Sequence, residues 1–89
     1  MASNFRLFSY KNQNNLHLQL FGDFDGDSAH QLINALKTGN NVESIFVDTN
    51  DLNRVYNFGI SVFEKQLRTL FKKPGALIFI GKNKGNFIH

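Results

Sequence analysis

The stretch from residue 45 to residue 63 reads IFVDTNDLNRVYNFGISVF, and it joins a strand pattern to a helix pattern. Ile45-Phe46-Val47 is a short apolar run that ends at Asp48, which is typical of a buried central strand covered on both faces. The apolar residues that follow recur at helical spacing, and they are Tyr56, Ile60, Phe63, Leu67 and Leu70. A core-facing helix with this stripe is predicted directly after the strand.

Two strand patterns open the chain. Residues 5–10 alternate in the period of a strand, and residues 16–21 place three leucines on one face with His17 and Gln19 on the other. The polar residues 11–15 break the pattern between them. These features predict an N-terminal β-hairpin.

A first helix is predicted between the hairpin and the central strand. Its apolar positions follow the i, i+3, i+4, i+7 spacing, and they are Ala29, Leu32, Ile33 and Leu36. Asp27 or Ser28 is expected to cap its N-terminus. Lys37 is expected in the last turn, where a cation interacts favourably with the helix dipole. Gly39 is expected just beyond the C-terminus of the helix, in the left-handed conformation.

The end of the chain supplies a last strand. Pro74-Gly75 ends the second helix, residues 76–80 form a second continuous apolar run, and the basic turn 81–85 closes it. The predicted order is ββαβαβ. It indicates an α/β sandwich with a mainly parallel four-stranded sheet, an N-terminal antiparallel hairpin and two helices.

Length and composition set the class of protein. Eighty-nine residues fit one domain, residues 1–89, without a linker or repeat. The chain has no cysteine, which excludes disulfides and thiolate metal sites and favours a reducing, cytoplasmic location. No apolar run approaches the roughly 20 residues that span a bilayer, and no secretory signal is expected.

Charge is unevenly distributed along the chain. Residues 1–53 carry three basic and six acidic side chains, a net charge of −3, whereas residues 54–89 carry seven basic and one acidic, a net charge of +6. The simplest explanation for the positive charge of residues 54–89 is a solvated basic surface. A nucleic-acid or nucleotide-binding module that uses this half is the alternative.

Two segments, together with the element order, resemble the STAS domain of bacterial anti-sigma factor antagonists and sulfate-transporter tails. Gly22-Asp23-Phe24-Asp25 is similar to the family's turn between the second strand and the first helix. Residues 48–63 lie without gaps on its pattern of a strand-ending Asp, a short loop and Asp-Ser-Ser/Thr-Gly at the start of the next helix. The resemblance covers about residues 16–80 and implies a STAS-like fold.

The chain departs from this family at the phosphorylation motif. The aligned residues are Tyr56-Asn57-Phe58-Gly59, so the hydroxyl that a partner kinase phosphorylates is missing. Asn57 is still expected to cap the helix, as in a domain held permanently in the partner-competent form. The chain also ends soon after the fourth strand, where relatives usually continue into a further helix and strand, so the resemblance leads us to expect one sheet face or groove to be uncovered.

The resemblance implies a partner-binding surface at the start of the second helix. Its residues are Asp25, Tyr56, Asn57, Phe58, Gly59 and Ser61. Asp25 either shapes this surface or bonds its own backbone. Phe58 lies off the apolar stripe and is expected to be exposed as an interface anchor. Ser61 is a surface residue or a substitute phosphorylation site.

Other chemistry finds little support in the sequence. Asp23, Asp25 and Asp27 suggest a calcium loop, but Ser28 and Asn34 stand where it needs glycine and a bidentate carboxylate. The three histidines are scattered, and the turn 81–85 lacks the full phosphate-loop spacing. No metal or other cofactor is expected. An enzyme ranks last, because no nucleophile and base or pair of catalytic carboxylates can be assembled.

The sequence therefore predicts a non-enzymatic regulatory module that binds another protein. The partner classes implied are a switch kinase, a transport-complex subunit or a larger assembly of related domains. An assembly role through an exposed final strand is a further alternative. The sequence does not indicate an oligomeric state.

Overall fold

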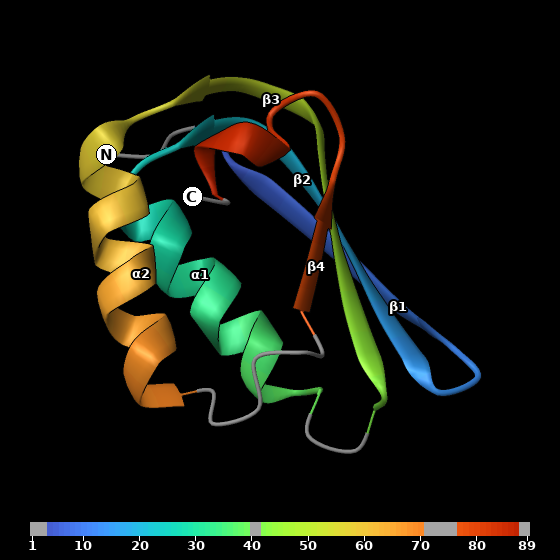
Figure 1. The fold of residues 1–89 in the computed structure, drawn as a ribbon. Coiled ribbons are helices and arrows are strands. Elements are labelled where there is room, and N and C mark those ends of the chain that lie inside the picture. The colour runs from blue at the N-terminus through green and yellow to red at the C-terminus, as the bar shows by residue number, and fades with distance from the viewer. Residues whose placement is uncertain (1–3, 40–41, 71–76, 88–89) are drawn as a thin grey trace.

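The computed structural model describes residues 4–39, 42–70 and 77–87. It is a two-layer α/β structure, a four-stranded sheet with the helices α1 and α2 against one face (Figure 1). The described elements, in chain order, are β1 (Arg6–Asn12), β2 (Asn15–Phe24), α1 (Gly26–Lys37), β3 (Ser44–Val55), α2 (Asn57–Leu70), β4 (Leu77–Ile80) and the 3-10 helix η2 (Lys84–Asn86). The predicted order ββαβαβ is confirmed.

The sheet has the strand order β1-β2-β3-β4. β1 and β2 form the predicted antiparallel hairpin, whose turn contains Gln13 with a φ of 58°. The pairs β2–β3 and β3–β4 are parallel. The mainly parallel sheet with an antiparallel edge strand is therefore confirmed.

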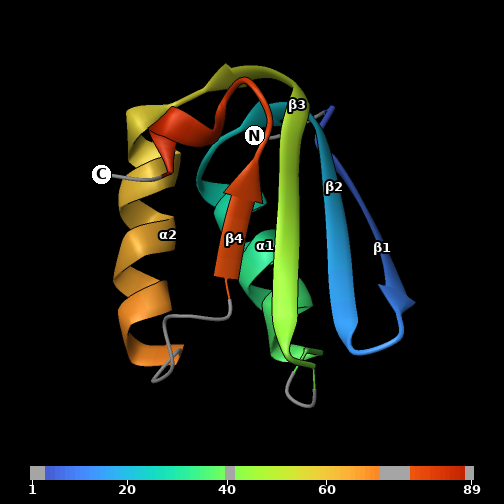
Figure 2. The same ribbon diagram turned by 45° about the vertical axis from the view of Figure 1, so that its right-hand side comes forward.

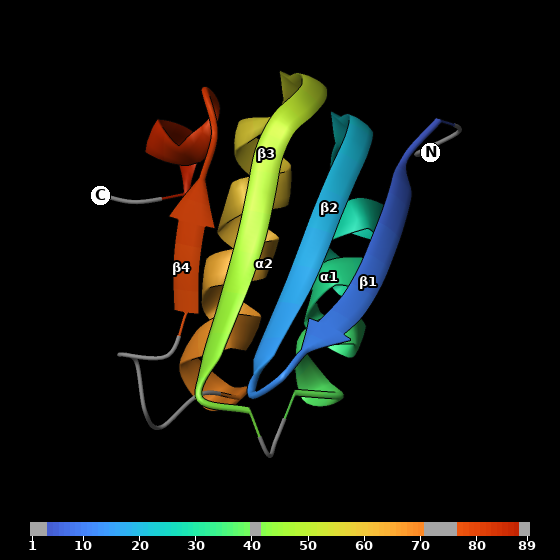
Figure 3. The ribbon, with the colours of Figure 1, turned by 90° about the vertical axis from the view of Figure 1, so that its right-hand side faces the viewer.

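Both helices cover the same face of the sheet (Figures 2 and 3). The reason is topological: right-handed crossovers from β2 to β3 and from β3 to β4 advance in one direction, so each places its helix on the same side. The prediction that Ile45-Phe46-Val47 is covered on both faces is wrong. Ile45 and Val47 are buried under the helices, whereas Phe46 faces the other way and is half-buried.

We call the uncovered side of the sheet the open face. Its apolar side chains are Phe8, Tyr10, Phe21, Phe46, Ile78 and Ile80. Side chains of a strand alternate between the two faces of a sheet, so the three leucines of β2 point to the helices and the residues between them point to the open face.

The core between the sheet and the helices centres on a cluster of phenylalanines. Phe24 packs edge-to-face on Phe63 at a centroid distance of 6.3 Å and on Phe87 at 5.0 Å. Phe79 stacks on Phe87 at 4.9 Å and meets Phe63 at 5.9 Å. The sequence predicted Phe63 and Phe79 as core residues but missed Phe87, which lies beyond the last predicted strand and returns to the core after η2.

β3 is longer than predicted. The sequence placed a loop after Asp48, but the strand continues to Val55 through register shifts opposite β2. The turn after β4 packs on this extension: the Asn83 side-chain amide donates to the Thr49 carbonyl at 2.8 Å and the Leu52 carbonyl at 3.2 Å. The turn 81–85 therefore has a structural role as a clamp on β3.

Two predicted helix-end signals are wrong. Asp25, not Asp27 or Ser28, is the N-cap of α1. Gly39 is not left-handed; instead a Cβ there would lie 3.0 Å from side-chain atoms of Ile45 and Leu16, so the position needs a small residue for close packing. Lys37 does lie in the last turn, as predicted.

Several predictions fall outside the described residues. These are the helix stop at Pro74-Gly75, the first strand residue Ala76 and, of the three histidines, the terminal His89. In the described part of the chain, neither helix is long and apolar enough to cross a membrane.

We expect Phe87→Ala to lower the free energy of unfolding by about 3 kcal/mol, because it empties the centre of the phenylalanine cluster. Urea denaturation followed by circular dichroism measures this. Gly85→Ala is the matched control, since nothing lies within 4 Å of an added Cβ there, and it should change stability by less than about 0.5 kcal/mol. Equal stability of the two variants would show that Phe87 does not complete the core.

Candidate functional site

The two helices begin side by side at one edge of the sheet (Figure 1). α1 follows β2 and α2 follows β3, and the last residues of these parallel strands, Phe24 and Val55, are paired. The pairing extends one residue further, because the Tyr56 N–H donates to the Phe24 carbonyl at 2.9 Å. The carboxyl ends of adjacent parallel strands are where α/β proteins commonly form binding sites.

Two glycines let the helix starts approach closely. A Cβ on Gly59 would lie 2.8 Å from the carbonyl carbon and oxygen of Asp25, so the first turn of α2 rests on the backbone that opens α1. A Cβ on Gly26 would lie 2.8 Å from Cε2 of Phe58, so the Phe58 ring lies against the first residue of α1. The first turn of each helix thus contains a glycine at the point where it contacts the start of the other helix.

Asp25 holds the start of α1. Its backbone is extended, with φ of −125°, and its carboxylate accepts a hydrogen bond from the Ser28 N–H at 3.1 Å. The buried Ser28 hydroxyl lies within hydrogen-bonding distance of that carboxylate, at 3.1 Å, and of the Asp23 carbonyl, at 2.9 Å. Asp25 is therefore an N-cap as well as a neighbour of α2.

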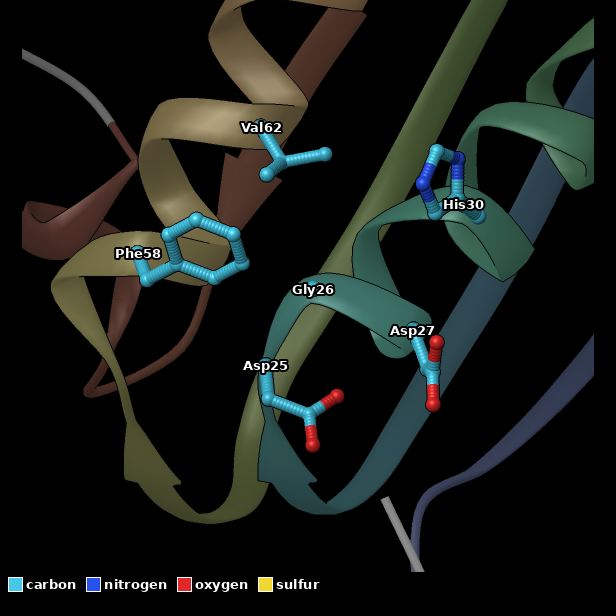
Figure 4. Close-up of a pocket in the computed structure, with 6 residues that line it drawn as sticks. All are labelled: Asp25, Gly26, Asp27, His30, Phe58 and Val62. Atoms are coloured by element: carbon cyan, nitrogen blue, oxygen red, sulfur yellow. The ribbon is translucent and has the colours of Figure 1, made fainter. Parts of the chain in front are cut away.

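Phe58 stands exposed between two shallow pockets. Its side chain is 70% exposed although it sits in the first turn of α2. One pocket, of about 300 Å³, lies between the helices and is lined by Asp25, Gly26, Asp27, His30, Phe58 and Val62 (Figure 4). The other, also about 300 Å³, lies on the strand side and is lined by Asp23, Asp25, Tyr56 and Phe58. We call these residues together the helix-start surface.

Three aspartates line the pockets beside Phe58, and Arg54 lies next to them. Asp23, Asp25 and Asp27 line the pockets. The pKa of the Arg54 guanidinium is raised, first by a hydrogen bond with the Tyr56 side chain and then by electrostatic attraction to Tyr56 and Asp23. Arg54 thus balances part of the charge of Asp23, while the part of the helix-start surface nearer α1, with Asp25 and Asp27, stays acidic.

The predicted site residues meet with mixed outcomes. Phe58 is exposed, as predicted, and Asp25 lies against the start of α2. Tyr56 is not a core residue: it precedes the helix and is 42% exposed, with its side chain directed to Arg54. Asn57 is the first helical residue, so the predicted cap position shifts to Tyr56. Ser61 is exposed but lines neither pocket. The partner-binding role of all six residues stays a prediction.

The sequence did not single out Gly26, His30 or Val62 as members of the site. Their spacing does group them, because His30 is four residues after Gly26 and Val62 is four residues after Phe58, so each pair lies on one face of its helix. The sequence does not show, however, that these two helix faces meet. His30 is also tied to α2, because its Nδ1 lies 3.0 Å from Nε2 of Gln66.

Asp25, one of the three aspartates that suggested a calcium loop, has its carboxylate turned to the backbone of α1. Among residues 4–39, 42–70 and 77–87, no three His, Cys, Asp or Glu side chains are placed to hold a metal ion.

We expect Gly59→Ala to lower the free energy of unfolding by about 1–2 kcal/mol. The added methyl meets backbone atoms of Asp25, which cannot swing away, and overpacking of about 1–3 kcal/mol exceeds a helix-propensity gain of up to about 1 kcal/mol. Gly26→Ala is the matched control, because its methyl meets only the movable, exposed Phe58 ring. Thermal and urea denaturation distinguish the two, and an equal or higher stability of Gly59→Ala would contradict the close backbone contact.

No protein-family model matches the chain, and no curated protein matches it by sequence. Solved structures do match. The chain superposes on the anti-sigma factor antagonist SpoIIAA in its unphosphorylated form with a TM-score of 0.53 and 20% identity, over 74% of this chain and 62% of SpoIIAA.

Two other solved structures are similar. An uncharacterized protein of the DUF3478 family from Shewanella loihica PV-4, with a SpoIIAA-like fold, has a TM-score of 0.59 and 16% identity over 92% of this chain and 72% of its own. Mglu has a TM-score of 0.65 and 14% identity over 84% of this chain but 19% of Mglu. The chain thus spans less than two thirds of SpoIIAA and of Mglu. These likenesses show that the chain has the SpoIIAA-like, STAS-like fold.

Proposed function

We propose that this chain is a non-enzymatic regulatory module that binds a protein partner through the helix-start surface. The observation that carries the proposal is Phe58, a large apolar side chain left 70% exposed in a packed first turn. Its ring lies against Gly26, where no side chain intervenes. An exposed aromatic side chain with pockets beside it is the usual form of an interface anchor.

The charges around Phe58 indicate the chemistry of the partner. Asp23, Asp25 and Asp27 line the two pockets beside the ring, so the complementary surface carries an apolar pocket for Phe58 with Lys or Arg nearby. A switch kinase, a transport-complex subunit or a larger assembly of related domains fits, provided that it presents such a surface.

Asn57 gives this module a different regulation from a phosphorylated STAS domain. It is the first residue of α2, where a phosphoryl group would meet free N–H groups, but an amide cannot accept that group. We infer that binding at this surface is not switched off by phosphorylation at residue 57.

Nucleic acid is a poorer occupant of the helix-start surface. Its three carboxylates would repel phosphates. Lys82 and Lys84 are exposed, but they lie in the turn that clamps β3, away from the pockets.

The test is a comparison of proteins captured from the native extract by the wild-type chain, by Phe58→Ala and by Phe8→Ala. Phe8 is the matched control, because it is a similarly exposed phenylalanine, at 57%, on the open face. Capture is carried out at about 1 µM chain, where a weak self-association through the open face does not contribute. We expect at least one protein to be retained by the wild type and by Phe8→Ala, and to fall at least about tenfold with Phe58→Ala. Its affinity is then measured with the purified partner by calorimetry.

Two controls keep the result specific. The extract is treated with nuclease, so that proteins bridged by nucleic acid are removed. Denaturation curves must show that Phe58→Ala is folded, which its exposure favours. Capture that is equal for the two phenylalanine variants would contradict the proposal, as would recovery of nucleic acid alone.

A further inference from the structure

The open face of the sheet is a second apolar surface, independent of the helix-start surface. Figure 3 shows it toward the viewer, with both helices behind the strands. Phe8 and Tyr10 on β1 are 57% and 58% exposed, and Ile78 and Ile80 on β4 are 37% and 41% exposed. Within residues 4–39, 42–70 and 77–87, no element packs over them. Parallel strands are usually covered on both faces, so this face is typical of an interaction surface.

One row of this face is organised across neighbouring strands. Tyr10 stacks on His17 at a centroid distance of 4.8 Å and an interplanar angle of 5°, and His17 stacks on Phe46 at 5.1 Å and 17°. Ile78 is the register partner of Phe46 and continues the row on β4. The row holds its aromatic side chains in place before any partner arrives, which lowers the entropic cost of binding.

Two rows further along the strands, opposite charges lie on either side of β2. Arg6 on β1 and Asp51 on β3 are both register partners of Phe21, so they flank β2 at the same height. Both are exposed, and Asp51 is oriented by a hydrogen bond of 3.2 Å from the Gln19 side-chain amide.

We propose that a second copy of this chain packs on the open face about a two-fold axis that runs along β2. Such an axis places β1 of each copy over β3 of the other. It does not change the position of a residue along the strand direction, so residues of the same row face each other. Arg6 of each copy then lies opposite Asp51 of the other, Phe8 lies opposite Asp48, and Tyr10 lies opposite Phe46. β4 of each copy lies beyond the partner's β1. The charge pair forms twice, as a self-complementary interface requires. The two sheets form a sandwich of the aligned type.

Single-stranded nucleic acid is the main competitor for an aromatic sheet face, and the structure disfavours it. Bases stack on exposed ring faces, whereas the faces of His17 are already occupied by Tyr10 and Phe46. Asp48 and Asp51 also place carboxylates on this surface, where a phosphate backbone would be repelled.

The size of the face sets the strength of the association. An axis along β2 brings three strands of each copy into contact, β1, β2 and β3. At about 4.8 Å between strands and about 3.3 Å per residue over four residues, they cover roughly 10 by 13 Å between backbone positions. With side chains the contact stays below the roughly 800 Å² per partner of a standard interface. We therefore expect a weak dimer that forms reversibly with concentration.

The experiment is sedimentation equilibrium of the purified chain from about 10 µM to about 1 mM, the range in which weak dimers dissociate. The wild-type mass should rise from that of a monomer toward twice that value. Arg6→Glu and Asp51→Arg should each weaken association about tenfold, because each places like charges together at two contacts. The combined variant Arg6→Glu/Asp51→Arg should restore association to near the wild-type value.

The outcomes separate this proposal from the proposed function. Phe58→Ala should dimerise like the wild type, so failure of either proposal leaves the other intact. Thermal melting confirms that the charge variants are folded. A chain that stays monomeric up to about 1 mM, or association that the single charge reversals leave unchanged, overturns the proposal. So does a monomer that binds an oligouridylate probe in fluorescence anisotropy and loses this binding in Tyr10→Ser.

Discussion

The arrangement of this protein depends on the direction in which its parallel strands are added. β2, β3 and β4 follow one another across the sheet without a reversal, and right-handed crossovers then place α1 and α2 on the same face. Because β2 and β3 are neighbours, the two helices also start at the same edge. One topological choice therefore produces the helix-start surface and leaves the opposite face of the sheet open.

The helix-start surface combines a rigid base with an exposed tip. Gly59 lets α2 rest on the backbone of Asp25, while the Asp25 carboxylate caps α1 through the Ser28 N–H. One residue thus connects both helix starts, and a change in its backbone would shift both. Phe58 projects from this base into solvent. Because the backbone that carries Phe58 is held by the contact between the helix starts, binding needs little ordering of the main chain, which favours recognition by a partner with a preformed pocket.

The sequence predicted the element order, the hairpin and most of the core, because these follow from hydrophobic periodicity. The sequence-based predictions were wrong or incomplete where contacts between distant parts of the chain determine the structure. Phe87 joins the core only because the turn after β4 folds back, and β3 continues past Asp48 because β2 pairs with it beyond that point. Tyr56 fits the helical stripe by spacing but precedes the first helical residue. Gly26, His30 and Val62 could not be assigned to the site, since periodicity places residues on a helix face without showing which face meets another helix.

The two proposed interfaces are compatible because they lie on different parts of the molecule. The helix-start surface is formed at the edge where α1 and α2 begin, whereas the open face lies across the sheet from both helices (Figure 3). A dimer joined through the sheets would carry its helices on the outside, with one Phe58 on each copy accessible. Two linked binding surfaces raise the effective affinity for a partner that is itself dimeric or clustered, without any new contact. Weak self-association would then make partner binding sensitive to the concentration of the chain, a form of regulation that needs no hydroxyl at residue 57.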